Sequence, residues 1–268
     1  MGGRLLLESE GPGKGATPGL LTLINAGEGA PPYSRGHNVA ERSGTLAMNI
    51  TRLHSRSLGI LFLLPFFAYG MGTALVTSVL KDPEHLALVA GQRTPFVGGA
   101  LLLLLNSITV VGIGVLFFPI LRERSPSIAV AYVCTRVMEA LILIVGVVFL
   151  LCILQLGESA QGQTTPELVT LFKLLSKGNF WAYQLAMIIL GAGSVAFCLS
   201  LYRSRLLPSF LPLVGAVGYG LLALGSVLEL FGLPWGVLFS GPGGLFELFL
   251  GGWLIAKGFR TVTPSVAA

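Results

Sequence analysis

The chain has 268 residues, of which 53% are apolar and only 11% are charged. Soluble domains carry about 25% charged residues, so this composition excludes a protein whose whole surface faces water. The net charge of +5 does not indicate nucleic-acid binding, because the basic residues stand singly or in pairs between apolar segments and form no patch.

The first 50 residues differ sharply from the rest. They are rich in Gly, Pro, Ser and Glu, as in residues 10–15, and cannot bury enough apolar surface to offset the entropy of ordering. We therefore expect residues 1–50 to be a disordered N-terminal extension. Met48 begins a segment that is typical of a bacterial amino terminus, and our hypothesis is that residues 1–47 are an upstream extension.

Six apolar runs follow, and each approaches or exceeds the roughly 20 residues needed to cross about 30 Å of hydrocarbon. Helices are favoured over strands, because membrane-spanning strands would be about 10 residues long with alternating polarity. The expected fold is all-α, a polytopic bundle of six transmembrane helices over residues 51–260 with a short tail at 261–268. The expected spans are 58–80, 95–119, 127–154, 179–202, 208–231 and 234–256.

Two local signals refine these helices. Residues 241–244 combine one proline with three glycines and are the strongest candidate for a kinked or partly unwound segment. In the long connection at 155–178, Thr165 and Pro166 precede apolar residues with helical spacing, which predicts a short amphipathic helix. That helix either lies in the outer membrane interface or caps the bundle, and both alternatives stay open.

The Lys and Arg residues of the connections predict the orientation. One set of connections carries eight of them and the opposite set carries four, diluted by acidic residues. The positive-inside rule places the first set in the cytoplasm, so both termini are expected to be cytoplasmic, which requires an even number of spans. The eight residues are Arg52, Arg56, Arg122, Arg124, Arg203, Arg205, Lys257 and Arg260.

Four ionisable residues fall inside the spans: Arg136, Glu139, Glu229 and Glu247. Such a residue at a helix centre costs about 2.5–3.5 kcal/mol on insertion scales, so each needs a partner or a wet cavity. Arg136 and Glu139 share a helix face. At the helical rise, Arg136 and Glu247 both lie about 13 Å from the cytoplasmic ends of their spans. Glu139 and Asn106 lie about 18–20 Å from the same side, and Glu229 lies near the outer face. We therefore expect Arg136 to pair with Glu247, with Glu139 as its neighbour.

The candidate intramembrane polar cluster therefore consists of Arg136, Glu139, Glu247, Asn106 and Glu229. One interpretation is a polar cavity that binds or transports a small or ionic ligand. The alternative is a structural or signalling protein in which the charges only fix helix packing. Further polar side chains within the spans are Gln184, Tyr132, Tyr183 and Tyr219.

No catalytic or metal-binding motif is recognisable. The three histidines lie outside the spans, no HExxH occurs, and the three cysteines lack metal-ligand spacing. We therefore expect no catalytic residues, no cofactor and no metal. The expected partner is the lipid bilayer and not nucleic acid, while neither a small-molecule ligand nor a protein partner is identified.

Several segments resemble a known family. The segments are SLGILF at 57–62, RVME at 136–139, SLYR at 200–203 with LLP at 206–208, Gly215 and Gly218-Tyr219, PGGLFE at 242–247 and GWLIAKGF at 252–259. They resemble the bacterial membrane family catalogued as domain of unknown function 4386 (DUF4386). The resemblance covers about residues 50–260. It implies a six-helix bundle in the bacterial cytoplasmic membrane, and it implies no activity.

Overall fold

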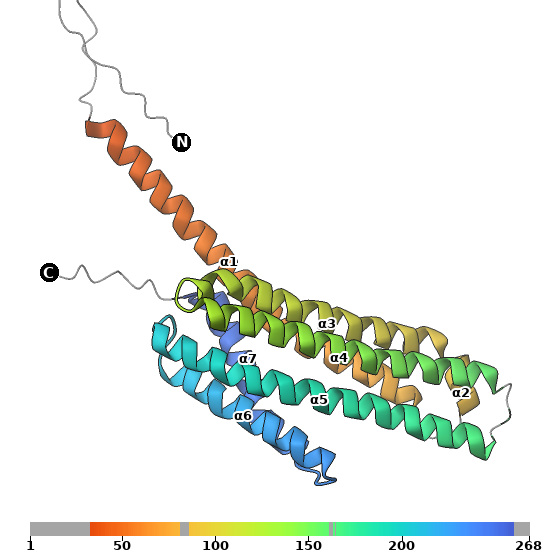
Figure 1. Ribbon diagram of the computed structural model, residues 1–268. Coiled ribbons are helices and arrows are strands. Elements are labelled where there is room, and N and C mark those ends of the chain that lie inside the picture. Colours follow the sequence, from red (N-terminus) through yellow and green to blue (C-terminus); the bar gives the residue numbers. More distant parts are fainter. Residues whose placement is uncertain (1–32, 81–85, 161–162, 164, 260–268) are drawn as a thin grey trace, which may run out of the picture. The chain divides into compact units, whose positions relative to one another are not determined.

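The computed structural model describes residues 33–80, 86–160, 163 and 165–259. The chain divides into two units, Met1–Thr45 and Leu46–Ala268, and the second unit contains the helical bundle. All regular structure in the described residues is helical. Seven helices occur there (Figure 1): α1 Tyr33–Val79, α2 Leu86–Gly91, α3 Arg93–Arg122, α4 Pro126–Ser159, α5 Pro166–Ser204, α6 Phe210–Leu230 and α7 Gly236–Ala256.

Six of these helices are long and apolar enough to cross a membrane, and α2 is the exception within the described chain. In α1 the candidate span is Arg52–Val79, and in the other five it is the whole helix. Each expected span overlaps one of them, so the prediction of an all-α bundle with six transmembrane helices is confirmed. The short helix α2 was not predicted from the sequence.

One boundary differs from the expectations. α1 begins at Tyr33, so residues 33–50 are helical where disorder was expected. Extending an existing helix adds one hydrogen bond for each residue that becomes ordered. No proline after Pro32 interrupts the helix in this stretch. Residues 1–32 and the tail at 261–268 lie outside the described residues.

The amphipathic helix expected after Thr165 is not a separate element. It forms the first turns of α5, because nothing between Pro166 and Ser204 interrupts the helix. The predicted start is nevertheless correct, since the Thr165 side chain accepts a hydrogen bond from the backbone N–H of Leu168. Phe172 is buried against Leu150 and its neighbours in an apolar cluster, so these turns pack on the bundle.

The helix α7 continues through residues 241–244, so this segment is not unwound, while a kink at this point stays a prediction. An interior proline removes one helical hydrogen bond, and contact with α6 supports the helix at this point. A methyl group at Gly218 of α6 would lie 2.8 Å from the backbone nitrogen of Gly243 of α7. The glycines of this segment therefore allow close packing between two helices.

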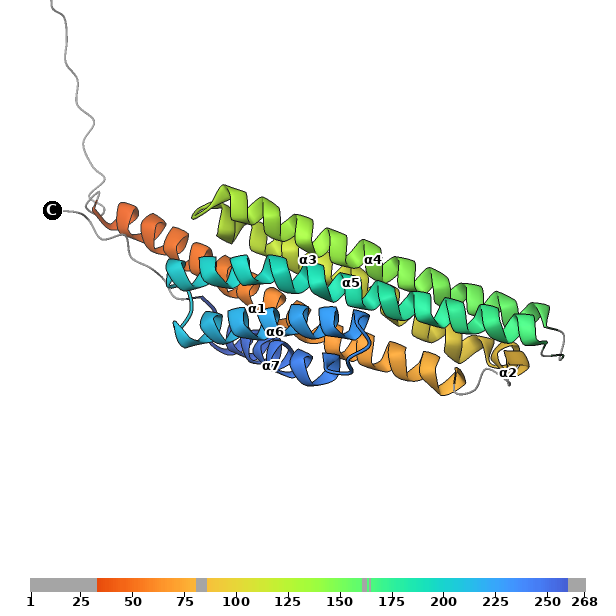
Figure 2. The same cartoon turned by 60° about the horizontal axis from the view of Figure 1, so that its bottom comes forward.

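The spanning helices form a ring in chain order. From α3 to α7, each packs against the next along the chain. α1 closes the ring, because Gly72 contacts Gly99 of α3 and Gly59 contacts Gly251 of α7. α6 and α7 are 21 residues each, whereas α5 has 39, so α3, α4 and α5 extend beyond α6 and α7 at one end (Figure 2).

The opposite end of the bundle holds Arg122, Arg205 and Lys257, and we call it the basic end. The outer surface carries large apolar side chains, among them Ile108, Val217 and Phe249, whose exposed fractions are 61%, 63% and 69%. A surface of this kind is unfavourable in water and suits contact with lipid. The chain is therefore a multi-pass membrane protein in contact with the bilayer.

Candidate functional site

The most deeply buried charge in the described bundle is Arg136, which is 1% exposed. It belongs to α4 and lies about 15 Å from the basic end by the helical rise. The neighbouring helix α3 presents Gly114 at this level, where an added methyl group would lie 3.1 Å from Cβ of Arg136. The glycine therefore makes room for the arginine stem between the two helices.

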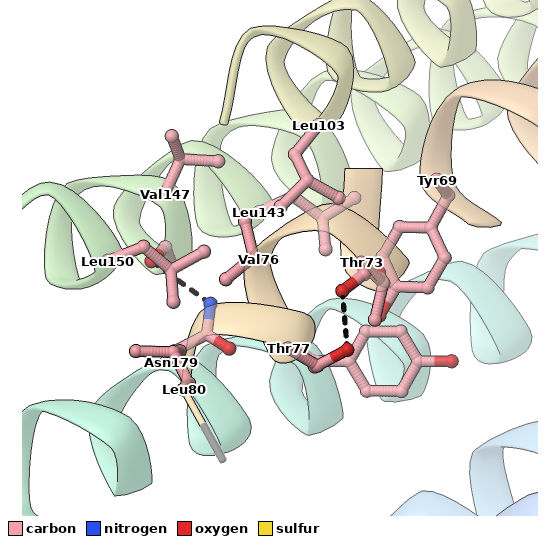
Figure 3. A pocket seen from close by; sticks show the side chains of 12 residues that line it. Tyr69, Thr73, Val76, Thr77, Leu80, Leu103, Leu143, Val147, Leu150 and Asn179 are labelled. Carbon is pink, nitrogen blue, oxygen red and sulfur yellow. Dashed lines mark hydrogen bonds between the residues drawn. The ribbon is translucent and has the colours of Figure 1, made fainter. Parts of the chain in front are cut away.

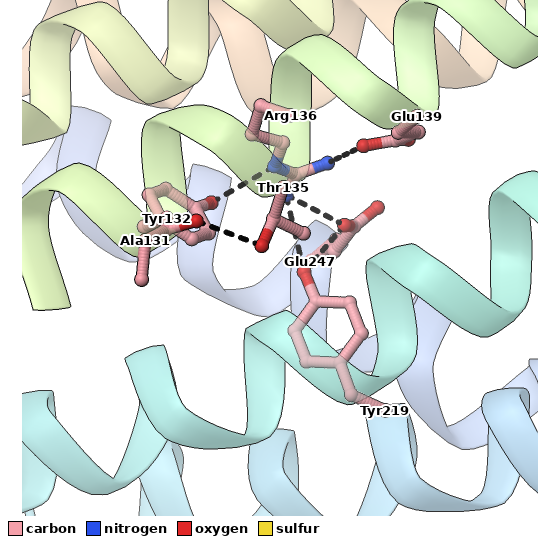
Figure 4. A network of polar contacts seen from close by, with 7 residues as sticks. All are labelled: Ala131, Tyr132, Thr135, Arg136, Glu139, Tyr219 and Glu247. Atoms are coloured by element: carbon pink, nitrogen blue, oxygen red, sulfur yellow. Dashed lines mark hydrogen bonds and ion pairs between the residues drawn. The ribbon is translucent and has the colours of Figure 1, made fainter.

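The guanidinium of Arg136 donates to four oxygen atoms from three helices (Figure 4). Nε donates to Tyr132 Oη at 3.1 Å, and Nη1 donates to Glu139 Oε2 at 3.1 Å. Nη2 points toward Tyr219 Oη at 3.4 Å and Glu247 Oε1 at 3.5 Å. Tyr219 donates to the same Glu247 oxygen at 2.5 Å. We call these five residues the polar network.

Packing holds the network in place. Gly218 and Gly243 bring α6 and α7 together immediately beside Tyr219 and one turn before Glu247. On α4, the ring of Tyr132 stacks on Phe197 with centroids 4.0 Å apart and an interplanar angle of 10°. The guanidinium carbon of Arg136 lies 5.3 Å from the Tyr132 ring centroid, within the range of cation–π attraction.

The polar network borders a cavity of about 330 Å³ inside the bundle, which we call the central cavity. Its polar lining residues are Tyr69, Asn106, Arg136, Glu139, Tyr183, Tyr219, Ser240 and Glu247. Its rim includes Phe66 and Gly70 of α1, which are both exposed, so the cavity reaches the surface of the bundle. The side chain of Glu247 is 17% exposed, compared with 3% for Glu139.

Several polar atoms of the central cavity have no partner in the described structure. The bonds to Arg136 use Oε2 of Glu139 and Oε1 of Glu247. The other oxygen of each carboxylate forms no hydrogen bond or ion pair with the described residues. Asn106 is 5% exposed, and the described residues offer its side chain no hydrogen-bond partner either. The site therefore presents unused hydrogen-bonding capacity inside the bundle.

A smaller cavity of about 90 Å³ adjoins the first (Figure 3). It contains Thr73, Thr77 and Asn179, and Asn179 donates to the backbone oxygen of Gly146 at 3.0 Å. The two cavities share Leu143 and the stacked rings of Tyr69 and Tyr183, whose centroids are 5.6 Å apart. They therefore meet at this tyrosine pair.

The structure brings together four of the five candidate residues. Arg136, Glu139 and Glu247 form ion pairs, and Asn106 lines the same cavity. Glu229 is not part of the site: it accepts a hydrogen bond from the backbone N–H of Gly236 at 3.0 Å. It therefore satisfies the first turn of α7, at the end of the helix remote from Glu247. Glu229 was a candidate because a charged residue inside a span needs a partner. The backbone N–H of Gly236 is that partner.

The sequence-based set also left out residues that belong to the site. Tyr219 was identified as a polar group in a span, but its hydroxyl was not assigned to Arg136 or Glu247. Tyr69 and Ser240 were not singled out at all, although both line the central cavity. Tyrosine and serine are common in helices with no ligand-related role, so residue type alone was too weak a signal.

No group of three or more His, Cys, Asp or Glu side chains in the described residues is arranged to hold a metal ion. A comparison with curated proteins and another with solved structures found no match. The family model for domain of unknown function 4386 matches residues 57–258. That stretch includes all five residues of the polar network and every residue that lines the central cavity. The chain belongs to the DUF4386 family.

Proposed function

We propose that this protein binds a small ionic ligand in the central cavity, or carries it across the bacterial cytoplasmic membrane. The observation that supports the proposal most strongly is the combination of a buried ion pair with a cavity of about 330 Å³. Cavities of about 300–1,000 Å³ with a few convergent polar groups are typical of small-molecule sites. Ionisable residues inside a membrane bundle commonly mark ligand or ion pathways.

The family resemblance and the short basic connections support the location and orientation in this proposal. The basic end would face the cytoplasm by the positive-inside rule. The central cavity would then lie near the middle of the membrane, since Arg136 and Glu247 are about 15 Å and 13 Å from that end by the helical rise and the hydrocarbon is about 30 Å thick.

A structural or signalling role is the second candidate, and one observation favours it. Arg136 joins α4 to both α6 and α7 through Tyr219 and Glu247. A buried arginine with several partners can fix one arrangement of helices without any ligand. In that case the remaining polar atoms would be covered by protein and the cavity would be closed to water.

Thiol labelling separates the two candidates. In a chain whose three native cysteines are replaced by alanine, Asn106→Cys places a thiol in the cavity lining. Ile108→Cys is a matched control on the same helix, two residues further on, at a side chain that is 61% exposed on the outer surface. Both proteins, in lipid vesicles, are treated with a small water-soluble methanethiosulfonate, and modification is followed by intact mass.

A ligand site predicts that the thiol at position 106 reacts and the thiol at 108 does not. Only a hydrated thiol ionises to the reactive thiolate, and the lipid-facing position lacks water. Failure of position 106 to react, in a protein that still melts cooperatively, would favour the structural role. A reaction at both positions would mean that the outer surface is not in lipid as described.

A further inference from the structure

We infer that the ligand of the central cavity is a small organic cation, an ammonium or guanidinium group attached to an apolar body. This inference rests on the proposed function and adds the chemical class of the ligand. It follows from three separate features: the charge balance of the polar network, the unpartnered amide of Asn106 and the aromatic walls of the cavity.

The charge balance of the cavity disfavours an anion. Of the described residues that line it, Arg136 is the one cation, and Glu139 and Glu247 are the two anions. The Arg136 guanidinium already faces four oxygen atoms. The uncommitted atoms, Oε1 of Glu139 and Oε2 of Glu247, are carboxyl oxygens that accept hydrogen bonds. An entering anion would meet these acceptors without a free cation, whereas an entering ammonium group would donate to them.

Asn106 gives an independent indication of a ligand. Its side chain is on α3, lines the cavity and is 5% exposed, yet it forms no hydrogen bond with the described residues. Leaving a buried amide without a partner costs about 1–3 kcal/mol. The amide oxygen can accept a further N–H bond from an ammonium or guanidinium group, so the amide and the two carboxylates would bind the same type of donor.

The remaining walls favour an organic cation over a metal ion. They include the rings of Phe66, Tyr69 and Tyr183 and the side chains of Met187 and Leu222. Cations attached to organic groups bind favourably over aromatic faces. A bare metal ion would need about six close oxygen ligands, and the volume of about 330 Å³ is roughly ten times the share of one water molecule. The space suits a charged head and an apolar body.

Matched probes test the inference on the full chain in lipid nanodiscs at neutral pH. The first set is benzylammonium, benzyl alcohol and benzoate, which have similar shapes and carry positive, zero and negative charge. The second set is butylammonium, butanol and butyrate. Sodium chloride at equal ionic strength is the control that shows whether a metal cation binds instead. Dissociation constants are measured by calorimetry, and thermal melting gives a second readout.

At least one ammonium probe should bind tenfold or more tightly than its neutral and anionic counterparts. Glu139→Gln, Glu247→Gln and Asn106→Leu should each weaken that binding at least tenfold. Glu229→Gln should leave it unchanged within twofold, because Glu229 contacts the start of α7 instead of the cavity. Asn106→Leu leaves every ion pair of the polar network intact, so the test does not depend on a variant that disturbs the fold.

Equal binding of all three charge types, or tighter binding of the carboxylate probes, would overturn the inference. Ammonium binding that Glu139→Gln, Glu247→Gln and Asn106→Leu leave unchanged would also overturn it, because the probe would then bind elsewhere. A wrong ligand class and a missing ligand site would give different results. If a thiol at position 106 is water-accessible but no ammonium probe is preferred, the ligand-site proposal stands and the cationic ligand does not. If that thiol is also unreactive, both fail.

Discussion

Removing either end of the Arg136–Glu247 contact should destabilise the bundle, but by unequal amounts. Arg136→Ala deprives Glu139 and Glu247 of their shared cation, and these side chains are only 3% and 17% exposed. Breaking a buried pair in this way costs about 3–5 kcal/mol. After Glu247→Ala, Arg136 keeps Glu139 at 3.1 Å. The variant then lacks only the carboxylate oxygen that accepts hydrogen bonds from Arg136 and Tyr219. Losing this acceptor should lower the free energy of unfolding by about 1.5–3 kcal/mol.

The double variant should cost less than the sum of the two single changes by about 1 kcal/mol or more, since residues of one network are coupled. The free energies of unfolding can be measured by denaturant titration in mixed micelles, followed by tryptophan fluorescence. Glu229→Ala is the matched control, because its carboxylate contacts the backbone N–H of Gly236 and not Arg136. In the double variant with Arg136→Ala, the two losses of unfolding free energy should add to within about 0.5 kcal/mol.

Strict additivity of Arg136→Ala and Glu247→Ala would refute the reasoning, because it would show that the two side chains do not interact. A loss on Glu247→Ala as large as that on Arg136→Ala would refute the part assigned to Glu139. In that case the arginine would depend on Glu247 alone for neutralisation.

Three further predictions concern packing and topology. Gly218→Val should lower the melting temperature strongly, because its Cβ would lie 2.8 Å from the backbone of α7, whereas Gly220→Ala, with open space around it, should change little. Equal melting of the two variants would contradict the close contact of α6 and α7. Reporter fusions after Arg124 and Arg205 should report the cytoplasm, and a periplasmic signal after Arg205 would reject this orientation. A chain that begins at Met48 should insert and melt like the full chain, and loss of insertion would show that the removed segment is needed.

The spans were predictable because the bilayer imposes a local requirement. About 20 consecutive apolar residues are needed to cross it, and this length can be counted along the sequence. The proximity of Arg136 and Glu247 followed from the same physics, since a charge at mid-depth needs a partner of similar depth. Helix ends were also visible where Thr165 and Pro166 combine a cap with a proline at the first position.

The ring order of the helices was not predictable, because it depends on contacts between distant segments. Depth alone could not show that Tyr219 of α6 would bond to Glu247 of α7, or that Glu229 would cap α7. The short helix expected after Thr165 is not separate, because polarity changes along α5 while the backbone continues unbroken. A cavity is likewise a property of several helices together, so the participation of Tyr69 left no local signal.

The proposed site requires that the cavity beside Arg136 is hydrated and has unused acceptors. A high-resolution structure of the full chain in lipid nanodiscs tests this requirement through the density inside the cavity. We expect ordered water or a bound ligand within hydrogen-bond distance of Glu139 Oε1, Glu247 Oε2 and the Asn106 amide. Helices closed over the site, with these atoms paired to other protein groups, or a lipid chain filling the space, would contradict it.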